Sequence, residues 1–253
     1  MTDNHIHIGQ FKEIYYDPVR VIQIVMEKCT EGLCFSSATS CNEGITYAEV
    51  ENEIDRTLTH IAWPPEIVRP YFWYAPSFIE QGVDFEKAVK NLPYKGVKLH
   101  PLAHQWNLDD EKTVNVLHGI FGYAGDNKLP VLIHTGHSGI DDADVFSRFF
   151  PLYPETKFIL AHCRPLYAAI ILLCNYPNVF GDTAFLPEED LGKIVEKELS
   201  NKMLLGSDFP VTNYFRNKFP AENEGTLSLE EQYAVDFERL RQFSDSLLIR
   251  VTG

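Results

Sequence analysis

The chain has 253 residues, 45% of them hydrophobic, which is enough for one large core. Its net charge of −14 and pI near 5.0 exclude a general nucleic-acid binder, which needs a basic surface. No apolar run reaches the roughly 18 residues of a membrane span, and the N-terminus lacks the basic and apolar segments of a signal peptide. The five cysteines show no CxxC spacing, so we expect reduced thiols in a cytoplasmic protein without membrane partners.

Short apolar runs alternate along the chain with longer segments of helical spacing. Each run has four to eight residues and is bounded by Gly, Pro, Asn or Ser, which is typical of buried parallel strands. The eight runs are 5–9, 32–37, 71–77, 95–100, 130–135, 157–162, 178–183 and 202–207. This alternation predicts eight strands in a parallel sheet.

The segments between the runs predict helices. One apolar stripe runs from Tyr47 to Ile61, and Asp109 and Asp110 are placed to start a later helix. Strands and helices in this alternation favour an α/β fold of the (β/α)8 TIM-barrel type. An open doubly wound sheet is disfavoured because no glycine-rich phosphate turn follows the first strand. Without a linker or repeat, residues 1–253 are expected to form a single domain.

Histidines gather where the predicted strands end. His5 and His7 share one face of the first strand, because side chains alternate with a period of two. The C-terminal strand ends form the face where barrel enzymes build their sites. Five of the nine histidines and one aspartate fall there: His5, His7, His100, His134, His162 and Asp208. A single histidine at a strand end is usually structural, but six such residues on one rim favour a shared site.

Imidazoles and carboxylates that meet at one point suit a borderline divalent metal. Zinc comes first, with manganese, iron and nickel as alternatives. A catalytic metal keeps a coordination position open for water and lowers the pKa of that water to about 7. An aspartate beside this water can hold the metal and also accept the proton. The expected cofactor is therefore one or two divalent ions, with Zn²⁺ as the simplest choice.

Five motifs occur in a recognisable order. They are HIHIG (5–9), GVKLHP (96–101), LIHTG (132–136), AHC (161–163) and GSDFP (206–210). In this order the chain resembles the amidohydrolase superfamily over residues 3–210, most closely amidohydrolase family 2, which includes metal-dependent hydrolases and decarboxylases. The resemblance implies that His5, His7, His134 and Asp208 bind metal, with Asp208 also moving the proton.

The fourth and sixth strands leave alternatives open. The resemblance implies that Lys98 is carboxylated by CO2 and bridges two ions, while the other interpretation pairs its ammonium with a nearby carboxylate. His100 is then a ligand or a donor to the substrate carbonyl. His162 either binds a second metal or acts beside a single ion as an acid or base. The GVKLHP strand and the lack of large insertions set the chain apart from the decarboxylating members.

Four further residues carry weaker signals. Arg164, just past His162, is either a clamp for a substrate carboxylate or phosphate or part of a surface salt bridge. Trp106 is a candidate for the pocket wall and for substrate binding, with plain loop packing as the alternative. Ser138 in GHSG lacks the GxSxG spacing of a serine nucleophile. Cys163 should face the helices, opposite to His162, and residues 213–225 are expected to form a loop over the mouth.

The leading hypothesis is a metal-dependent hydrolase of a small carbonyl compound, an amide, lactone or ester, in which Asp208 is the general base for a metal-activated water. The alternative is a lyase on the same scaffold, a decarboxylase or hydratase that acts on a small carboxylic acid. A phosphoesterase for small esters and a non-catalytic metal-binding protein are further alternatives. The expected partner is a small-molecule substrate, and a homo-oligomer is left open.

Overall fold

Eight parallel strands form one curled sheet in the computed structural model, which describes residues 1–221 and 225–248. Neighbours in the sheet follow the chain order, from β1 through β3 to β9. The strands are β1 Thr2–Phe11, β3 Gly32–Ser37, β4 Val68–Trp73, β5 Gly96–Leu99, β6 Val131–His134, β7 Phe158–Ala161, β8 Val179–Asp182 and β9 Met203–Leu204. A short strand, β2 Ile14–Tyr16, pairs antiparallel with the end of β1.

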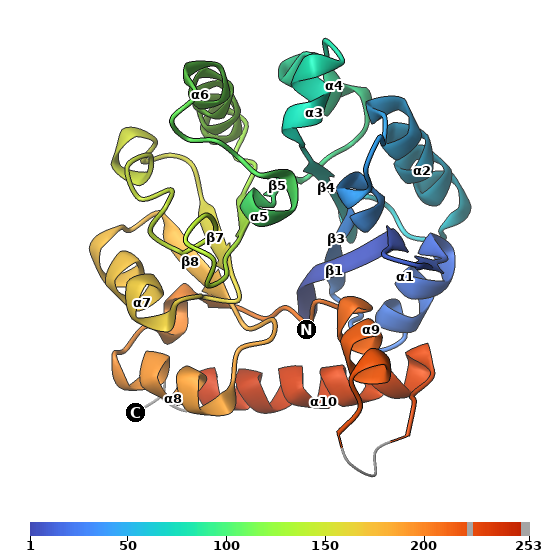
Figure 1. Ribbon diagram of the computed structural model, residues 1–253. Coiled ribbons are helices and arrows are strands. Elements are labelled where there is room, and N and C mark those ends of the chain that lie inside the picture. Colours follow the sequence, from blue (N-terminus) through green and yellow to red (C-terminus); the bar gives the residue numbers. More distant parts are fainter. Residues whose placement is uncertain (222–224, 249–253) are drawn as a thin grey trace.

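The sheet closes on itself between its first and last strands. The segment that follows β9 runs beside β1, where the Asn4 N–H donates to the Leu205 carbonyl over 2.8 Å and the Asp208 N–H donates to the His5 carbonyl over 2.8 Å. Figure 1 shows the strands inside a ring of helices. The predicted (β/α)8 barrel is confirmed, and its closure brings the first and last motifs together.

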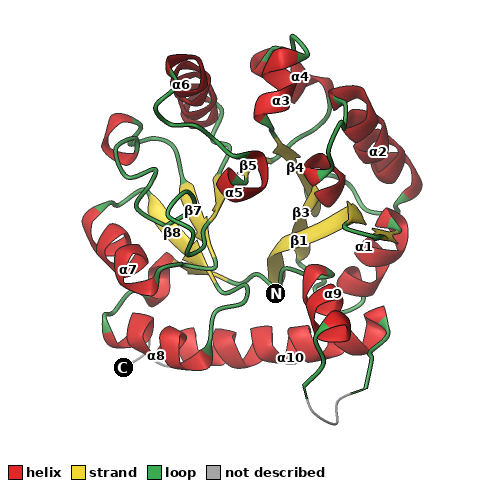
Figure 2. Ribbon diagram, in the orientation of Figure 1, coloured by secondary structure: helices red, strands yellow, loops and turns green. Residues whose placement is uncertain are grey.

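Helices cover the outside of the sheet (Figure 2). Several begin at the residues that the sequence predicts: the Asp110 carboxylate caps α6 by accepting from the Thr113 N–H over 2.8 Å. The helices are α1 Pro18–Met26, α2 Tyr47–His60, α3 Pro76–Glu80, α4 Phe85–Asn91, α5 Pro101–His104, α6 Glu111–Asp126, α7 Leu166–Asn175, α8 Glu188–Glu196, α9 Val211–Lys218 and α10 Leu229–Leu248. Within the described ranges, none of them is both long and apolar enough to cross a membrane.

Three expectations about the elements need correction. The third strand begins and ends earlier than predicted, at Val68–Trp73, because Pro76 opens α3 at its first turn. The eighth strand is paired in the sheet only over Met203–Leu204, since the next residues turn to β1. The expected loop from residue 213 begins inside α9, which ends at Lys218, while residues 222–224 lie outside the described part of the chain.

The inside of the barrel has an apolar floor. Cys34, Tyr71, Leu132, Ile159 and Ala161 form a buried cluster that is separate from the larger core between strands and helices. Side chains on a strand alternate, so residues two positions further along face the same interior one level higher. By this rule, Trp73 lies one level above Tyr71, and His134 lies one level above Leu132. The polar site therefore lies on hydrophobic packing at the C-terminal rim.

Candidate metal centre

A cavity of about 740 Å³ opens at the C-terminal ends of the strands. Its buried part is lined by most of the predicted site residues, and its outer part carries apolar and cationic side chains. The buried group is His7, Lys98, His162 and Asp208. His100 and His134 also line the cavity, and His5 lies directly beneath it with only 1% of its surface exposed. The barrel thus brings all seven predicted metal and catalytic positions to one place.

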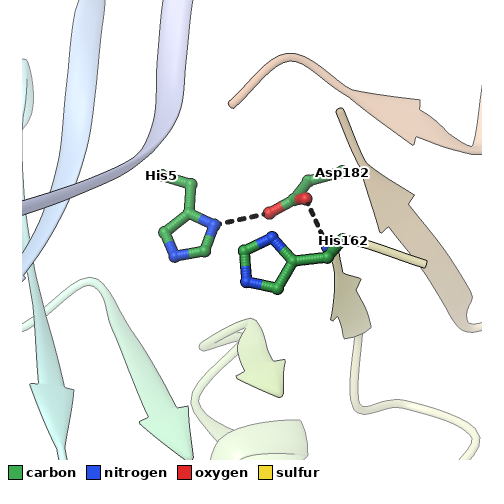
Figure 3. A group of neighbouring side chains, drawn as sticks. All are labelled: His5, His162 and Asp182. Atoms are coloured by element: carbon green, nitrogen blue, oxygen red, sulfur yellow. Dashed lines mark hydrogen bonds and ion pairs between the residues drawn. The ribbon is translucent and has the colours of Figure 1, made fainter. Parts of the chain in front are cut away.

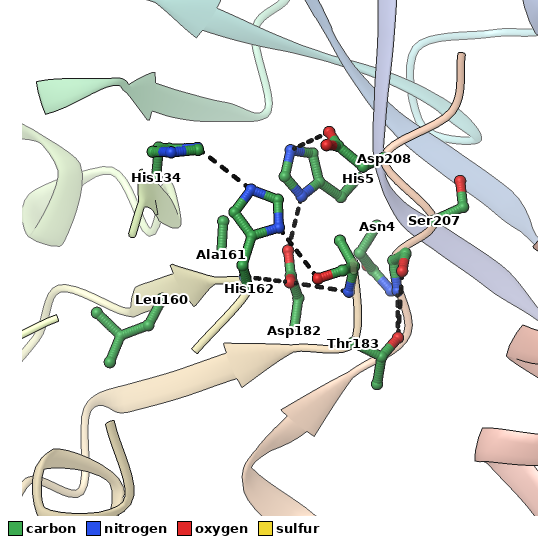
Figure 4. Close-up of polar contacts among 12 residues, drawn as sticks. Asn4, His5, His134, Leu160, Ala161, His162, Asp182, Thr183, Ser207 and Asp208 are labelled. Atoms are coloured by element: carbon green, nitrogen blue, oxygen red, sulfur yellow. Dashed lines mark hydrogen bonds and ion pairs between the residues drawn. The ribbon is translucent and has the colours of Figure 1, made fainter. Parts of the chain in front are cut away.

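Three buried atoms converge at the centre. The Nε2 atoms of His5 and His7 are 3.1 Å apart. Asp208 Oδ1 lies 2.9 Å from His7 Nε2. It also lies 3.2 Å from His5 Nε2, a contact that Figure 4 shows. The geometry directs no N–H at this oxygen, so Asp208 Oδ1 has no hydrogen-bond donor among the described residues.

Hydrogen bonds behind the two rings turn their Nε2 atoms toward this centre. His5 Nδ1 lies 2.7 Å from Asp182 Oδ2, and a carboxylate partner requires the proton to sit on Nδ1. Burial lowers the pKa of His5 well below its usual range, so the ring is neutral. Its Nε2 atom therefore carries a lone pair and no proton. His7 Nδ1 contacts Ser36 Oγ at 3.1 Å, which leaves its Nε2 for the centre.

A buried acceptor without a donor costs about 1–3 kcal/mol, and Asp208 Oδ1 is such an acceptor. A divalent cation among His5, His7 and Asp208 would satisfy it, since imidazole nitrogen and carboxylate oxygen are ligands that zinc prefers. These residues fit the implied metal.

A second pair of imidazoles faces the same cavity. His134 Nδ1 and His162 Nε2 are 3.2 Å apart. His162 Nδ1 donates to the Ala184 carbonyl over 3.0 Å, so the Nε2 atom of the neutral ring carries a lone pair. Asp141 Oδ2 lies 3.4 Å from His134 Nε2 on the far side of the ring. The structure therefore offers a second place where imidazole nitrogens converge.

Two of the central residues have a strained backbone. His162 has φ 68° and Asp208 has φ 64°, in the left-handed region that residues with a Cβ rarely adopt. Such conformations cost on the order of 1 kcal/mol each and persist where surrounding contacts hold them. His162 follows β7 and Asp208 follows β9, so both lie where the backbone leaves the sheet toward the cavity.

Lys98 forms no direct ion pair with any carboxylate in the described part of the chain. Its Nζ lies 3.1 Å from His5 Nε2 and 5.6 Å from the centre of the Trp73 ring. Within the described ranges, no Asp or Glu oxygen comes within 4.0 Å of it, which removes the expected alternative of a direct ion pair. Burial lowers the pKa of Lys98 to about 8, although Asp208 raises it. The amine is thus far easier to deprotonate than an exposed lysine.

His100 presents a donor to the cavity. Its Nδ1 accepts from the Ala103 N–H over 3.2 Å, which places the proton of the neutral ring on Nε2. The ring is stacked on His134 with 3.7 Å between centroids. It is also stacked with the Trp73 ring, with 5.6 Å between centroids. Burial lowers the pKa of His100 well below its usual range, so the ring is neutral.

The rim of the cavity combines arginine with aromatic rings. Arg164 Nη2 donates to the Phe185 carbonyl over 3.1 Å, and its guanidinium lies 6.0 Å from the centre of the Phe185 ring. Arg164 forms no ion pair with any described residue, so the structure does not contain the alternative surface salt bridge. Phe215 stands 6.1 Å from Phe185 and 6.2 Å from Phe11, and all three line the cavity.

Trp106 is not at the cavity, contrary to expectation. It is 2% exposed and packs in the main hydrophobic core. Gln105 ends α5 in the left-handed conformation, and this turn directs the chain inward, where the Trp106 N–H donates to the Pro101 carbonyl over 3.2 Å. Trp73 forms the cavity wall instead. Cys163 is buried in the layer between strands and helices, as predicted.

Several partners of the site histidines were missed at the level of the sequence. Asp182 behind His5 ends the strand predicted over 178–183, as His134 ends its own strand, so the same rule would have found it. Asp141 behind His134 lies in an irregular loop, and Ser36 behind His7 sits in an unremarkable apolar strand. Nothing in the local sequence distinguishes those two.

Comparisons with known proteins agree with this geometry. The model of the amidohydrolase family (Amidohydro_2) matches residues 2–235. No curated protein is significantly similar to the chain in sequence. An amidohydrolase from Mycoplasma synoviae has a similar structure, with a TM-score of 0.58, 14% identity and coverage of 96% of this chain and 81% of the other.

An N-acetylneuraminate lyase from the same organism is similar with a TM-score of 0.51 and 13% identity, over 100% of this chain and 82% of the other. Identities this low show the barrel fold alone. The family model spans most of the chain and includes every residue of the candidate centre. The chain therefore belongs to the amidohydrolase family.

Proposed function

We propose that the protein is a metal-dependent hydrolase of a small carbonyl compound that carries an anionic group. The observation that carries this proposal is the buried Asp208 oxygen without a donor, set against the Nε2 atoms of His5 and His7. Zn²⁺ is the proposed ion because it accepts this mixed nitrogen and oxygen set. When bound, the ion would polarise a substrate carbonyl and lower the pKa of a water molecule.

The residues around the centre suit the remaining steps. Oδ1 of Asp208 faces the two histidines, which leaves its second oxygen, Oδ2, to accept the proton of the attacking water. His100 is neutral with its proton on Nε2, and this N–H is the proposed donor to the substrate carbonyl oxygen. The proton held by Asp208 would then pass to the leaving group.

His162 has a different proposed role. Burial lowers the pKa of His162 to about 4, so the ring is neutral at physiological pH, and its Nε2 atom lies 3.2 Å from His134 Nδ1. A neutral lone pair suits a ligand better than an acid. We therefore assign His162 with His134 to a second ion, which Lys98 would bridge once its amine has reacted with CO2. The short distance from Lys98 Nζ to His5 Nε2 supports this bridging position.

Charge in the cavity supports an anionic substrate. Lys12 and Arg164 line the outer part, whereas Asp208 is the single acidic residue among the described lining residues and is assigned to the metal. This excess of cations occurs in a chain of net charge −14, so it is a local feature of the site. The guanidinium of Arg164 can bind a carboxylate through two parallel hydrogen bonds. The ring of Phe11, Phe185 and Phe215 suits an apolar part of the same molecule.

The proposal is tested by metal analysis together with Asp208→Asn. Purified protein should contain Zn²⁺ or another divalent ion, and chelation should remove activity toward a panel of small anionic amides, lactones and esters. Asp208→Asn should lower kcat by about 10²–10⁴-fold, with the fold retained in circular dichroism, because asparagine tolerates the left-handed backbone at this position. Retained activity would exclude Asp208 as the base.

Product analysis separates the hydrolase from the lyase alternative. A hydrolase incorporates ¹⁸O from labelled water into the carboxyl product, whereas a decarboxylase releases CO2 without net addition of water.

A further inference from the structure

Asp182, at the end of β8, is a buried carboxylate to which the proposed chemistry assigns no step. Its side chain is 1% exposed. Asp182 Oδ2 accepts from His5 Nδ1 over 2.7 Å. Asp182 Oδ1 accepts from the backbone N–H groups of His162, over 2.8 Å, and Ala184, over 3.1 Å. Figure 3 shows this carboxylate joined to the ring of His5 and to the backbone of His162.

The same carboxylate controls both rings. It holds the proton of His5 on Nδ1 directly. It holds Ala184 through the backbone N–H, and the carbonyl of Ala184 in turn accepts from His162 Nδ1 over 3.0 Å. Both histidines therefore carry their protons on Nδ1 and turn the Nε2 lone pair toward the centre, as the contacts in Figure 4 show.

Two interpretations of this cluster compete. His5, His162 and Asp182 each offer a ligand atom within 4.8 Å of the others, so they could themselves hold a cation. However, three N–H groups already point at the two oxygens of Asp182. A cation there would have to displace these donors. The hydrogen-bonding role is the one that the geometry satisfies completely.

We propose that Asp182 is a positioning residue that sets the tautomers of His5 and His162 together, so that both present Nε2 to the metal. This inference rests on the proposed metal site. A carboxylate behind a metal-binding histidine fixes the ring and makes it a more basic ligand, and loss of such a partner typically costs 10–100-fold in metal affinity. Here one carboxylate serves two histidines that lie on different strands.

Asp182→Asn tests the two halves of the network separately. The amide oxygen can still accept from the backbone N–H groups of His162 and Ala184. The amide NH₂ then faces His5 Nδ1 in place of a carboxylate oxygen and becomes a donor. His5 should therefore move its proton to Nε2, while His162 keeps its proton on Nδ1. A merely structural role for Asp182 would not predict a change confined to His5.

The readouts are ¹⁵N–¹H correlation spectra of the histidine rings in metal-free protein and Zn²⁺ affinity in competition with a chromogenic chelator. Asp182→Asn should change the His5 tautomer and weaken Zn²⁺ binding by about 10–100-fold. Asp236→Asn is the matched control, because this buried aspartate accepts from Thr212 Oγ1 over 2.6 Å and Gln232 Nε2 over 2.9 Å, away from the site histidines. It should bind Zn²⁺ like the wild type.

Wild-type affinity in Asp182→Asn, or a wild-type His5 ring protonated on Nε2, would overturn the proposal. If the variant does not fold, the wild-type spectrum still decides, because the proposal requires Nδ1–H on both His5 and His162. Wild-type protein that binds no Zn²⁺ contradicts the proposed function instead, and the tautomers still decide for or against the network.

Discussion

Gly206, the first residue of GSDFP, leaves room for His5. A Cβ atom added there would lie 2.8 Å from His5 Cβ and 3.5 Å from Asp182 Oδ2. The φ angle of Gly206 is outside the left-handed region, so alanine is acceptable for the backbone and contact with His5 is the main obstacle. Gly206→Ala therefore tests how closely His5 is held.

The size of the effect follows from the shift that alanine requires. Carbon atoms in contact are normally about 3.5–4.0 Å apart, so His5 must move by about 1 Å. The same movement lengthens the 2.7 Å contact from His5 Nδ1 to Asp182 Oδ2 toward the limit of a hydrogen bond. Overpacking costs about 1–3 kcal/mol, and a hydrogen bond to a charged group about 1.5–3 kcal/mol.

Because these contributions overlap, we expect a loss of about 2–4 kcal/mol in the free energy of unfolding. For a chain of this size, that loss lowers Tm by about 5–15 °C. Zn²⁺ affinity should fall by about 10–100-fold, as for loss of the carboxylate partner.

Thermal unfolding of metal-free protein and chelator competition measure the two effects. Gly192→Ala on α8 is the matched control, because a Cβ at this exposed position has no atom within 4 Å. This variant should gain up to about 1 kcal/mol from higher helix propensity and bind Zn²⁺ normally. Gly206→Ala with the wild-type Tm and the wild-type Zn²⁺ affinity would refute the reasoning, since His5 would then tolerate displacement.

Lys98→Met keeps the side-chain volume but removes the amine, so bound Zn²⁺ should fall from about two ions per chain to about one in elemental analysis with bicarbonate present; an unchanged ratio would exclude the bridge. Arg164→Lys should raise KM for anionic substrates by at least about tenfold with little change in kcat, because the bidentate contact is lost, and an equal rise for neutral analogues would argue against a carboxylate clamp. Burial raises the pKa of Asp236 from 3.8 to about 6, so the folded state binds this proton more tightly and its contribution to stability is lost as pH rises from about 4 to 6. Between pH 4 and pH 7, the free energy of unfolding of the wild type, measured with urea, should fall by roughly 2–3 kcal/mol relative to that of Asp236→Asn. A difference between the two proteins that is independent of pH would contradict the assignment.

The barrel and the ring of polar residues at its rim could be predicted from local patterns. Apolar runs that alternate with helical segments leave few topologies, and a period of two decides which side of a strand faces inward. His5 and His7 could be assigned to one face for this reason. His134 and His162 follow because the ends of parallel strands share one rim.

The partners behind these histidines were decided by the tertiary structure. Asp182 is 177 residues from His5 and touches it only because the ring of strands closes beside β1. Trp106 lies in the core instead of the cavity wall because one left-handed residue turns the chain inward after α5. Strand periodicity is a local property and can be read along the chain. The hydrogen bonds that determine a histidine tautomer depend on which strand ends, far apart in the sequence, come into contact. A local sequence pattern holds no information about such contacts.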